Sequence, residues 1–261
     1  MKIHRNPPFI AGNWKMHATL AEARALLSEI VRAAPRLSPV RLVVFPPFTA
    51  LSEASKIAQG SPVAVGGQDV YWEDKGAFTG EISGPMLKDA GCAYAIIGHS
   101  ERRQLFGETD TAVNRKTRAA LLHGLSPIVC IGESLEEREA GRTIAKIKTS
   151  LDEGLRGRTR EDMERIVLAY EPIWAIGTGR TATPGQAEEV HAFIRNDLEE
   201  KYGNPTASCA IILYGGSVKP ANAYSLFKEK NIDGFLVGGA SLEAESFIQI
   251  AKEALRAYEE E

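Results

Sequence analysis

Cysteine is scarce in this sequence, and the three cysteines present are poorly placed for cross-linking or for binding a metal. Cys92, Cys130 and Cys209 are widely separated, and no C-x-x-C pair occurs. An odd, scattered set argues against a disulfide framework and against a zinc site. We therefore expect three small core residues in a reducing compartment, which favours a cytoplasmic location.

Long apolar runs and an excess of positive charge are also missing. No run approaches the roughly 18 apolar residues of a membrane span, so no membrane partner is expected. Pro7 and Pro8 precede a short apolar run that ends at Asn13 and Lys15, which is not the pattern of a secretory signal. The formal net charge is −3 and no basic stripe occurs, so nucleic acid is not expected as a partner.

The sequence contains no linker and no low-complexity stretch. Its 261 residues are 44% hydrophobic and 25% charged, close to the average of globular proteins, so a disordered or fibrous class is excluded. A chain of this length is ordinary for one α/β barrel. We therefore expect a single domain that spans residues 1–261.

Short apolar runs recur along the whole chain. They are continuous rather than alternating, as is typical of strands that are buried on both faces of a parallel sheet. The eight runs are Phe9–Ala11, Arg41–Phe45, Val63–Val65, Tyr94–Ile97, Pro127–Ile131, Ile166–Ala169, Ala210–Leu213 and Gly234–Val237.

Helical patterns fill the segments between these runs. Val190, Ile194 and Leu198 share one helix face, and Thr183 followed by Gln186 forms a capping box at the start of that helix. Eight repeats of strand and helix leave a doubly wound open sheet or a closed barrel. The strand count and the length favour an α/β fold of the (β/α)8 TIM-barrel type, with eight parallel strands and an outer ring of helices.

Polar residues gather directly after several of the apolar runs. In barrels of this type the active site forms at the carboxyl ends of the strands. Each residue alone has an ordinary explanation: a solvated lysine, a capping histidine, a polar strand end. Their convergence on one rim is what indicates a site. The residues are Asn13 and Lys15 after the first run, His99 after the fourth, Glu171 after the sixth, Ser217 after the seventh, and Gly238 and Gly239 after the eighth.

The two glycine-rich turns after the last strands have a physical use. Backbone N–H groups approach a phosphate closely only where no side chain intervenes, and helix N-termini beyond such turns favour anions. The alternative is that these glycines only permit tight turns. Two such turns in adjacent repeats, one of them carrying Ser217, shift the balance toward a phosphate site.

A third glycine segment, Gly177–Ala182, fits the pattern G-x-G-x-x-A of dinucleotide-binding proteins. We reject that interpretation because a long apolar segment separates these glycines from the strand, and the helix is expected to begin only at Thr183. An apolar segment with a glycine tip is more typical of a hinged lid, here centred on residues 176–178.

Four motifs in order, which extend over most of the chain, resemble those of the triosephosphate isomerase family. They are FIAGNWKM at residues 9–16, GHSERR at residues 98–103, AYEPIWAIGTG at residues 169–179 and YGGSV at residues 214–218. The resemblance implies interconversion of dihydroxyacetone phosphate and D-glyceraldehyde 3-phosphate through an enediolate, in glycolysis and gluconeogenesis, with no cofactor and no metal.

The resemblance also implies a role for each site residue. Glu171 would be the base that moves a proton between neighbouring carbons, and His99 the electrophile that polarises the carbonyl. Asn13 and Lys15 would bind the substrate, and Gly177, Ser217, Gly238 and Gly239 would hold its phosphate. The chemistry agrees, because removing a proton next to a carbonyl needs a base and a group that stabilises the oxyanion. A histidine at the start of a helix should stay neutral, and burial under a lid should raise the pKa of Glu171.

The segment around residues 69–81 resembles the family's dimer loop, and we expect a homodimer. Its matching residues are Asp69, Gly76, Phe78, Thr79, Gly80 and Glu81. The chain departs from the family pattern at three positions. Asp69 stands where asparagine is common, Gly84 stands where proline usually follows the serine, and Arg180 replaces a lysine. These departures concern the interface and the lid hinge rather than the proposed catalytic groups.

Two other functions compete with an isomerase. An aldolase barrel would need a Schiff-base lysine inside a strand, whereas Lys15 lies past a strand end beside Asn13. A non-catalytic phosphosugar-binding barrel would need the glycine turns but not Glu171 and His99 together. Because the barrel supports many reactions, the fold alone does not decide between them.

Overall fold

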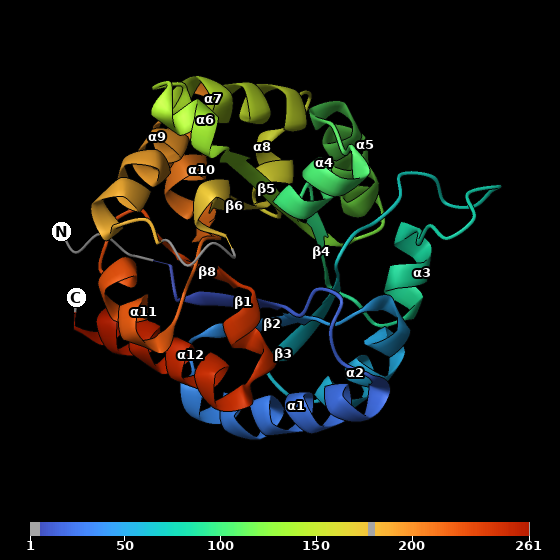
Figure 1. The fold of residues 1–261 in the computed structure, drawn as a ribbon. Coiled ribbons are helices and arrows are strands. Elements are labelled where there is room, and N and C mark those ends of the chain that lie inside the picture. Colours follow the sequence, from blue (N-terminus) through green and yellow to red (C-terminus); the bar gives the residue numbers. More distant parts are fainter. Residues whose placement is uncertain (1–5, 177–180, 261) are drawn as a thin grey trace.

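The computed structural model describes residues 6–176 and 181–260, and within these residues eight parallel strands close into a barrel. Each strand pairs with its neighbour in sequence, and β1 pairs with β8 to close the ring (Figure 1). The strands are β1 (Phe9–Asn13), β2 (Arg41–Phe45), β3 (Val63–Gly67), β4 (Tyr94–Ile97), β5 (Ser126–Glu133), β6 (Val167–Pro172), β7 (Ile211–Tyr214) and β8 (Gly234–Val237).

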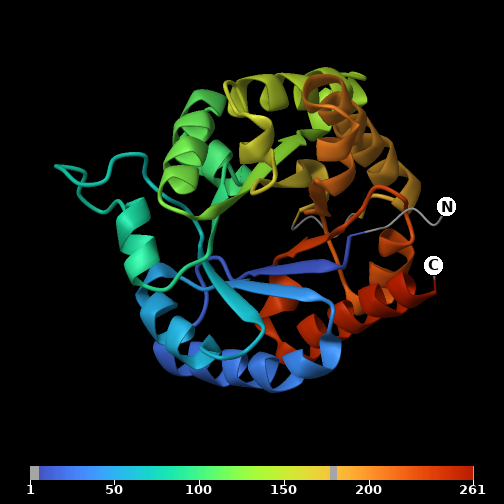
Figure 2. The same cartoon turned by 180° about the vertical axis from the view of Figure 1, so that it is seen from behind.

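Helices surround the barrel on the outside (Figures 1 and 2), so the expected fold class is confirmed. The α-helices are α1 (Leu20–Ala33), α2 (Leu51–Ala58), α3 (Gly84–Asp89), α4 (Ser100–Phe106), α5 (Asp110–Leu122), α6 (Leu135–Glu139), α7 (Thr143–Gly154), α8 (Arg160–Met163), α9 (Pro184–Tyr202), α10 (Asn204–Cys209), α11 (Pro220–Phe227) and α12 (Ala244–Glu259). Short 3-10 turns are η1 (Ala34–Leu37), η2 (Phe48–Ala50), η3 (Ile173–Ala175) and η4 (Gly239–Leu242).

The apolar runs form strands because both of their faces are covered. Successive side chains of a strand point to opposite faces, so one set fills the barrel and the other packs under the helices. In β1, for example, Phe9 and Ala11 belong to one buried cluster and Ile10 to the other. The smaller cluster consists of Phe9, Ala11, Val43, Phe45, Ile96, Ile128, Cys130, Val167, Ala169, Leu213 and Leu236.

Several strands continue further than the apolar runs. β1 includes Asn13 and β6 includes Glu171, so these two polar residues lie in the last part of their strands rather than after them. The ladder continues because β5 runs on to Glu133 and keeps a partner for β6, with Gly132 opposite Glu171. Parallel ladder bonds therefore fix the backbone of Glu171 as part of the sheet.

Helix starts follow the expected capping signals. Thr183 caps α9 in a capping box with Gln186, and α9 begins at Pro184, well after β6. The expected start of this helix at the Thr183 capping box is confirmed. The expectation of three core cysteines is wrong for one of them. Cys92 and Cys130 are buried, but Cys209 ends the short surface helix α10 and is exposed.

The connection between β3 and α3 projects away from the barrel (Figures 1 and 2). At its end Ser83 caps α3, and Gly84 lies against the ring of His123 from α5. A Cβ atom at Gly84 would come within 2.5 Å of that ring, so this departure from the family pattern has a packing reason.

In the described part of the chain, no helix combines the length and the apolar character that a membrane crossing demands.

Candidate active site

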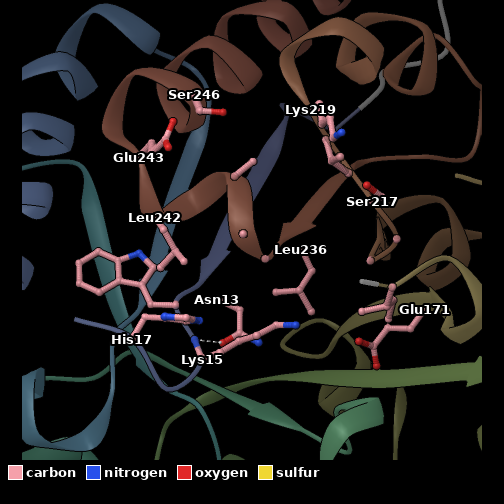
Figure 3. A pocket seen from close by; sticks show the side chains of 18 of the residues that line it. Asn13, Lys15, His17, Glu171, Ser217, Lys219, Leu236, Leu242, Glu243 and Ser246 are labelled. Atoms are coloured by element: carbon pink, nitrogen blue, oxygen red, sulfur yellow. Dashed lines mark hydrogen bonds between the residues drawn. The ribbon is translucent and has the colours of Figure 1, made fainter. Parts of the chain in front are cut away.

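A cavity of about 600 Å³ opens at the carboxyl ends of the strands. The described site residues predicted from the sequence all line it, and they come from five different strand ends. Figure 3 shows Asn13 and Lys15 on one side of the cavity and Glu171 and Ser217 on the other. The lining side chains include Asn13, Lys15, His17, His99, Glu171, Ser217, Lys219, Leu236, Leu242, Glu243 and Ser246, together with Gly215, Gly216, Gly238 and Gly239.

Glu171 is buried at the end of β6, with 2% of its surface exposed. The backbone N–H of Ser100 donates to Oε2 at 2.9 Å, and the Ser100 hydroxyl donates to Oε1 at 3.3 Å. The Nε2 atom of His99 lies 3.1 Å from the same Oε1. The carboxylate is thus held by several donors at the first turn of α4 and points into the barrel mouth.

Glycines in β5 and directly after β7 make room for Glu171. A Cβ atom at Gly132 in β5 would lie 1.9 Å from the carbonyl oxygen of Glu171. A Cβ atom at Gly215, after β7, would lie 2.9 Å from its Cγ. The close approach therefore requires glycine at both positions.

His99 is the N-cap residue of α4 and is 6% exposed. Its Nδ1 atom accepts a hydrogen bond from the backbone N–H of Glu101 at 3.2 Å. An Nδ1 atom that accepts this bond carries no proton, so the proton of the neutral ring lies on Nε2, which faces Glu171 and the cavity. In this tautomer the site presents an N–H donor beside a carboxylate.

Lys15 brings positive charge to the cavity. Its Nζ atom forms an ion pair with Oε1 of Glu101 at 2.5 Å. Its backbone is left-handed, with φ at 52°, a conformation that residues other than glycine rarely adopt. The Oδ1 atom of Asn13 accepts a hydrogen bond from the backbone N–H of Lys15 at 3.0 Å, so the two residues form one unit after β1.

The glycine turns lie beside Lys15. A Cβ atom at Gly238 would lie 3.4 Å from Cε of Lys15, and one at Gly239 would project into open space. Ser217 lines the same cavity after β7. Gly177, Thr178 and Arg180, which the sequence assigns to the phosphate site and the lid, lie outside the described residues.

Sequence analysis missed four residues that contact the predicted ones. Ser100 and Glu101 belong to the GHSERR motif. Their contacts with Glu171 and Lys15 could have been predicted, because polar residues next to His99 at the same strand end lie close to the other predicted site residues. Gln68 and Cys130 gave no such signal. Cys130 lies next to Glu171 in the barrel, and its burial, together with the charge of Glu171, raises the pKa of its thiol well above the usual range.

A buried charged cluster lies behind the His99 turn. Lys116 donates to both carboxylate oxygens of Asp69, at 2.8 and 2.9 Å, and to Oε2 of Glu108 at 2.8 Å. Arg102 Nε lies 2.9 Å from Asp69 and 2.8 Å from Glu108. The second oxygen of Glu108 accepts from the backbone N–H of Gly98 at 3.0 Å, which ties the cluster to the turn that carries His99.

Fold and site together define a class of protein. An eight-stranded α/β barrel holds a carboxylate, an imidazole and a lysine around one cavity, with glycine turns suited to an anion. Among residues 6–176 and 181–260 no group of histidine, cysteine, aspartate and glutamate side chains is arranged to hold a metal ion. A carboxylate, an imidazole, a lysine and glycine turns around one cavity are typical of a barrel enzyme that transfers protons on a small phosphorylated substrate.

Comparison with known proteins identifies the particular family. The family model of triosephosphate isomerase matches residues 8–254, and the chain belongs to that family. It is 56% identical over 243 residues to the triosephosphate isomerase of Moorella thermoacetica, covering 93% of this chain and 97% of that protein. It is 54% identical over 245 residues to the triosephosphate isomerase of Trichlorobacter lovleyi, covering 94% of this chain and 98% of that protein.

A solved structure supports the same assignment. The crystal structure of triosephosphate isomerase from Bartonella henselae superposes with a TM-score of 0.86 at 39% sequence identity, covering 94% of this chain and 98% of that one. The chain is therefore an isomerase that interconverts triose phosphates in glycolysis.

Proposed function

We propose that Glu171 and His99 carry out the proton transfers of this isomerisation. The observation that carries the proposal is the 3.1 Å approach of His99 Nε2 to Glu171 Oε1 at the mouth of the cavity. Glu171 takes a proton from the carbon next to the substrate carbonyl, while the Nε2–H of His99 donates to the carbonyl oxygen, which becomes the enediolate oxygen. A proton also passes, through His99, from the neighbouring hydroxyl oxygen to the enediolate oxygen. Glu171 then returns its proton to the former carbonyl carbon, so that the former hydroxyl oxygen becomes the new carbonyl oxygen and aldehyde and ketone are exchanged.

The hydrogen bonds of Glu171 define what must change when substrate binds. Its two oxygens are occupied by Ser100 and by His99. A carboxylate in that position cannot also contact a substrate carbon, so it exchanges the Ser100 bonds for the substrate when the base acts.

Lys15, Asn13 and the glycine turns form the substrate-binding side of the proposal. Lys15 neutralises substrate charge, and its Cε lies against Gly238. The backbone N–H groups of Gly238 and Gly239, with Ser217, hold the phosphate, and Gly177 is a further predicted contact. Positive charge at this place is needed because the chain as a whole carries −3.

The test is the isomerisation of dihydroxyacetone phosphate by Glu171→Gln. This substitution keeps the shape and removes the base, so we expect kcat to fall by at least a thousandfold while thermal unfolding changes little. Ser217→Ala serves as the comparison, because losing one phosphate contact should raise KM and reduce kcat far less. Equal rates for wild type and Glu171→Gln would refute the assignment of the base.

We also propose that the chain is a homodimer whose interface includes the projecting β3–α3 connection. Phe78 on this connection is exposed, and a second cavity of about 70 Å³ lies beside it, lined in part by Phe48 and Arg102. The ring of Phe106, 68% exposed, packs under the Arg102 guanidinium at 5.1 Å. Exposed apolar side chains around such a cavity are typical of an interface.

A single domain and a cytoplasmic location complete the proposal. The pairing of β1 with β8 supports one domain, since strands from both ends of the chain are needed to close the barrel. All three cysteines are free, which supports a reducing compartment.

A further inference from the structure

Gln68 lies directly after β3, half-buried, and its side-chain amide points away from its own loop. Nε2 donates to the carbonyl oxygen of Lys15 at 2.7 Å and to the carbonyl oxygen of Phe45 at 2.9 Å. Because both partners are carbonyls, only the NH2 group can face them, and both of its protons are used. The amide therefore joins the ends of three strands, β1, β2 and β3.

The segment that Gln68 holds is the one whose backbone is left-handed. At Lys15 a φ of 52° has to be maintained by its surroundings, because this conformation is unfavourable for a residue with a Cβ atom. On the amino side, Asn13 Oδ1 accepts from the Lys15 N–H. On the carboxyl side, Gln68 donates to the Lys15 carbonyl. The peptide groups on either side of the Lys15 Cα atom are thus fixed by side chains.

The backbone conformation of Lys15 sets where its charge lies. From this position the side chain passes Gly238 and reaches Oε1 of Glu101. A relaxation of φ toward the right-handed region would turn the Cα–Cβ bond and carry Nζ away from the phosphate turn and from Glu101. Both described hydrogen bonds of the Gln68 side chain go to the carbonyl groups of Lys15 and Phe45, and neither goes to its own loop.

We infer that Gln68 is a positioning residue for the reaction, and that its amide locks Lys15 in the backbone conformation that aims Nζ into the substrate cavity. The inference rests on the substrate-binding role proposed for Lys15. Glutamine is suited to this task because it supplies two donors in one plane without adding charge. A carboxylate at the same place would put its oxygens next to two carbonyl oxygens, which repel them and cannot donate a hydrogen bond.

The experiment measures kcat, KM and the inhibition constant of inorganic phosphate for wild type, Gln68→Met, Lys15→Met and the double variant. Gln68→Met keeps the side-chain volume and removes the donors. We expect kcat/KM to fall by about 10- to 100-fold, as displacement of a substrate-orienting group by about 1 Å does, and the phosphate inhibition constant to rise. On the Lys15→Met background the same change should alter kcat/KM by less than about twofold, because the group it positions is gone.

Gln59→Met, at the exposed end of α2, is the matched control and should behave as wild type. Folded Gln68→Met with unchanged kcat/KM and phosphate inhibition, or an equal loss with and without Lys15, would overturn the inference. Full activity of Lys15→Met would instead overturn the proposed role of Lys15, which is a separate failure.

A second pair of variants covers the case in which Gln68→Met does not fold. Gln68→Lys keeps donors at this position, and Gln68→Glu replaces them with acceptors, while both add one charge. We expect kcat/KM of Gln68→Lys to exceed that of Gln68→Glu by about tenfold. The reverse order, or equal values, contradicts the inference.

Discussion

Asp69 puts a second carboxylate into the buried cluster of Lys116, Glu108 and Arg102, at a position where the family commonly has an uncharged asparagine. Burial raises the pKa of Asp69 to about 6, and the charge of Glu108 adds to the rise, whereas Lys116 and Arg102 oppose it. Arg102 also feels the charge of Glu81 from the projecting connection. By contrast, contacts with Lys116 and Arg102 outweigh burial and lower the pKa of Glu108.

These pKa values predict how stability depends on pH. The folded-state pKa of Asp69 is above its unfolded value, so the folded protein binds this proton more tightly, and the contribution of Asp69 to stability improves as pH falls through 6. The gain should be about 1 kcal/mol between pH 7 and pH 5 and approach about 3 kcal/mol below pH 4. Asp69→Asn has no titratable group at this position, so its free energy of unfolding lacks this pH-dependent contribution.

The measurement is the free energy of unfolding in urea at fixed protein concentration, from pH 7.5 to pH 4.5, for wild type and Asp69→Asn. The difference between the two curves should shift in favour of wild type as pH falls. Parallel curves would show that Asp69 does not take up a proton in this range.

At the scale of elements, α9 is attached to the amino-terminal ends of β7 and β8 by one arginine. Arg195 donates to Asp233 Oδ2 at 2.7 Å and to the carbonyl oxygens of Ala207 at 2.6 Å and Ala210 at 3.1 Å. Asp233 is buried and also accepts from the backbone N–H of Ile212 at 2.8 Å. One guanidinium thus connects a helix to two strands on the side of the barrel opposite the active site.

Arg195→Ala is expected to lower the free energy of unfolding by about 3–5 kcal/mol, because it leaves the carboxylate of Asp233 buried without its cation. Urea denaturation gives this value. Arg142→Ala is the control, since Arg142 pairs with Glu136 on the surface and its removal should change stability by less than about 1 kcal/mol. A similar small effect at both positions would contradict the structural role of Arg195.

The elements and most of the site were predictable from sequence, for identifiable reasons. Apolar runs give the strands, because each strand is covered on both faces, and the Thr183 capping box gives the start of α9. Motif residues at the carboxyl ends of strands give Lys15, His99 and Glu171, because parallel strands bring these ends together. Gln68 and the Asp69 cluster were not predictable in their contacts, since their partners are 23 to 53 residues away in sequence and include backbone carbonyls that carry no sequence signal.

At the scale of the whole molecule, the proposed homodimer makes a prediction about mass. Wild type at micromolar concentration should scatter light as twice 28.4 kDa. Phe106→Glu places a charge among the exposed apolar side chains near Arg102 and should shift the mass toward the monomer and lower the activity at least tenfold on dilution. Leu135→Glu is the control, because it places the same charge on a partly exposed apolar residue of α6, and it should leave the mass unchanged. A fully active wild-type monomer would contradict the dimer.

The pairing of β1 with β8 has a consequence for how the chain matures. During synthesis β1 leaves the ribosome early, but its second neighbour, residues 234–237, is made almost last. Until then the growing sheet keeps two open edges with unpaired N–H and C=O groups, which are templates for pairing with other chains. The addition of one four-residue strand removes both edges at once. A chain truncated before residue 234 is therefore left with the sheet edges that invite aggregation, even though most of its strands are present.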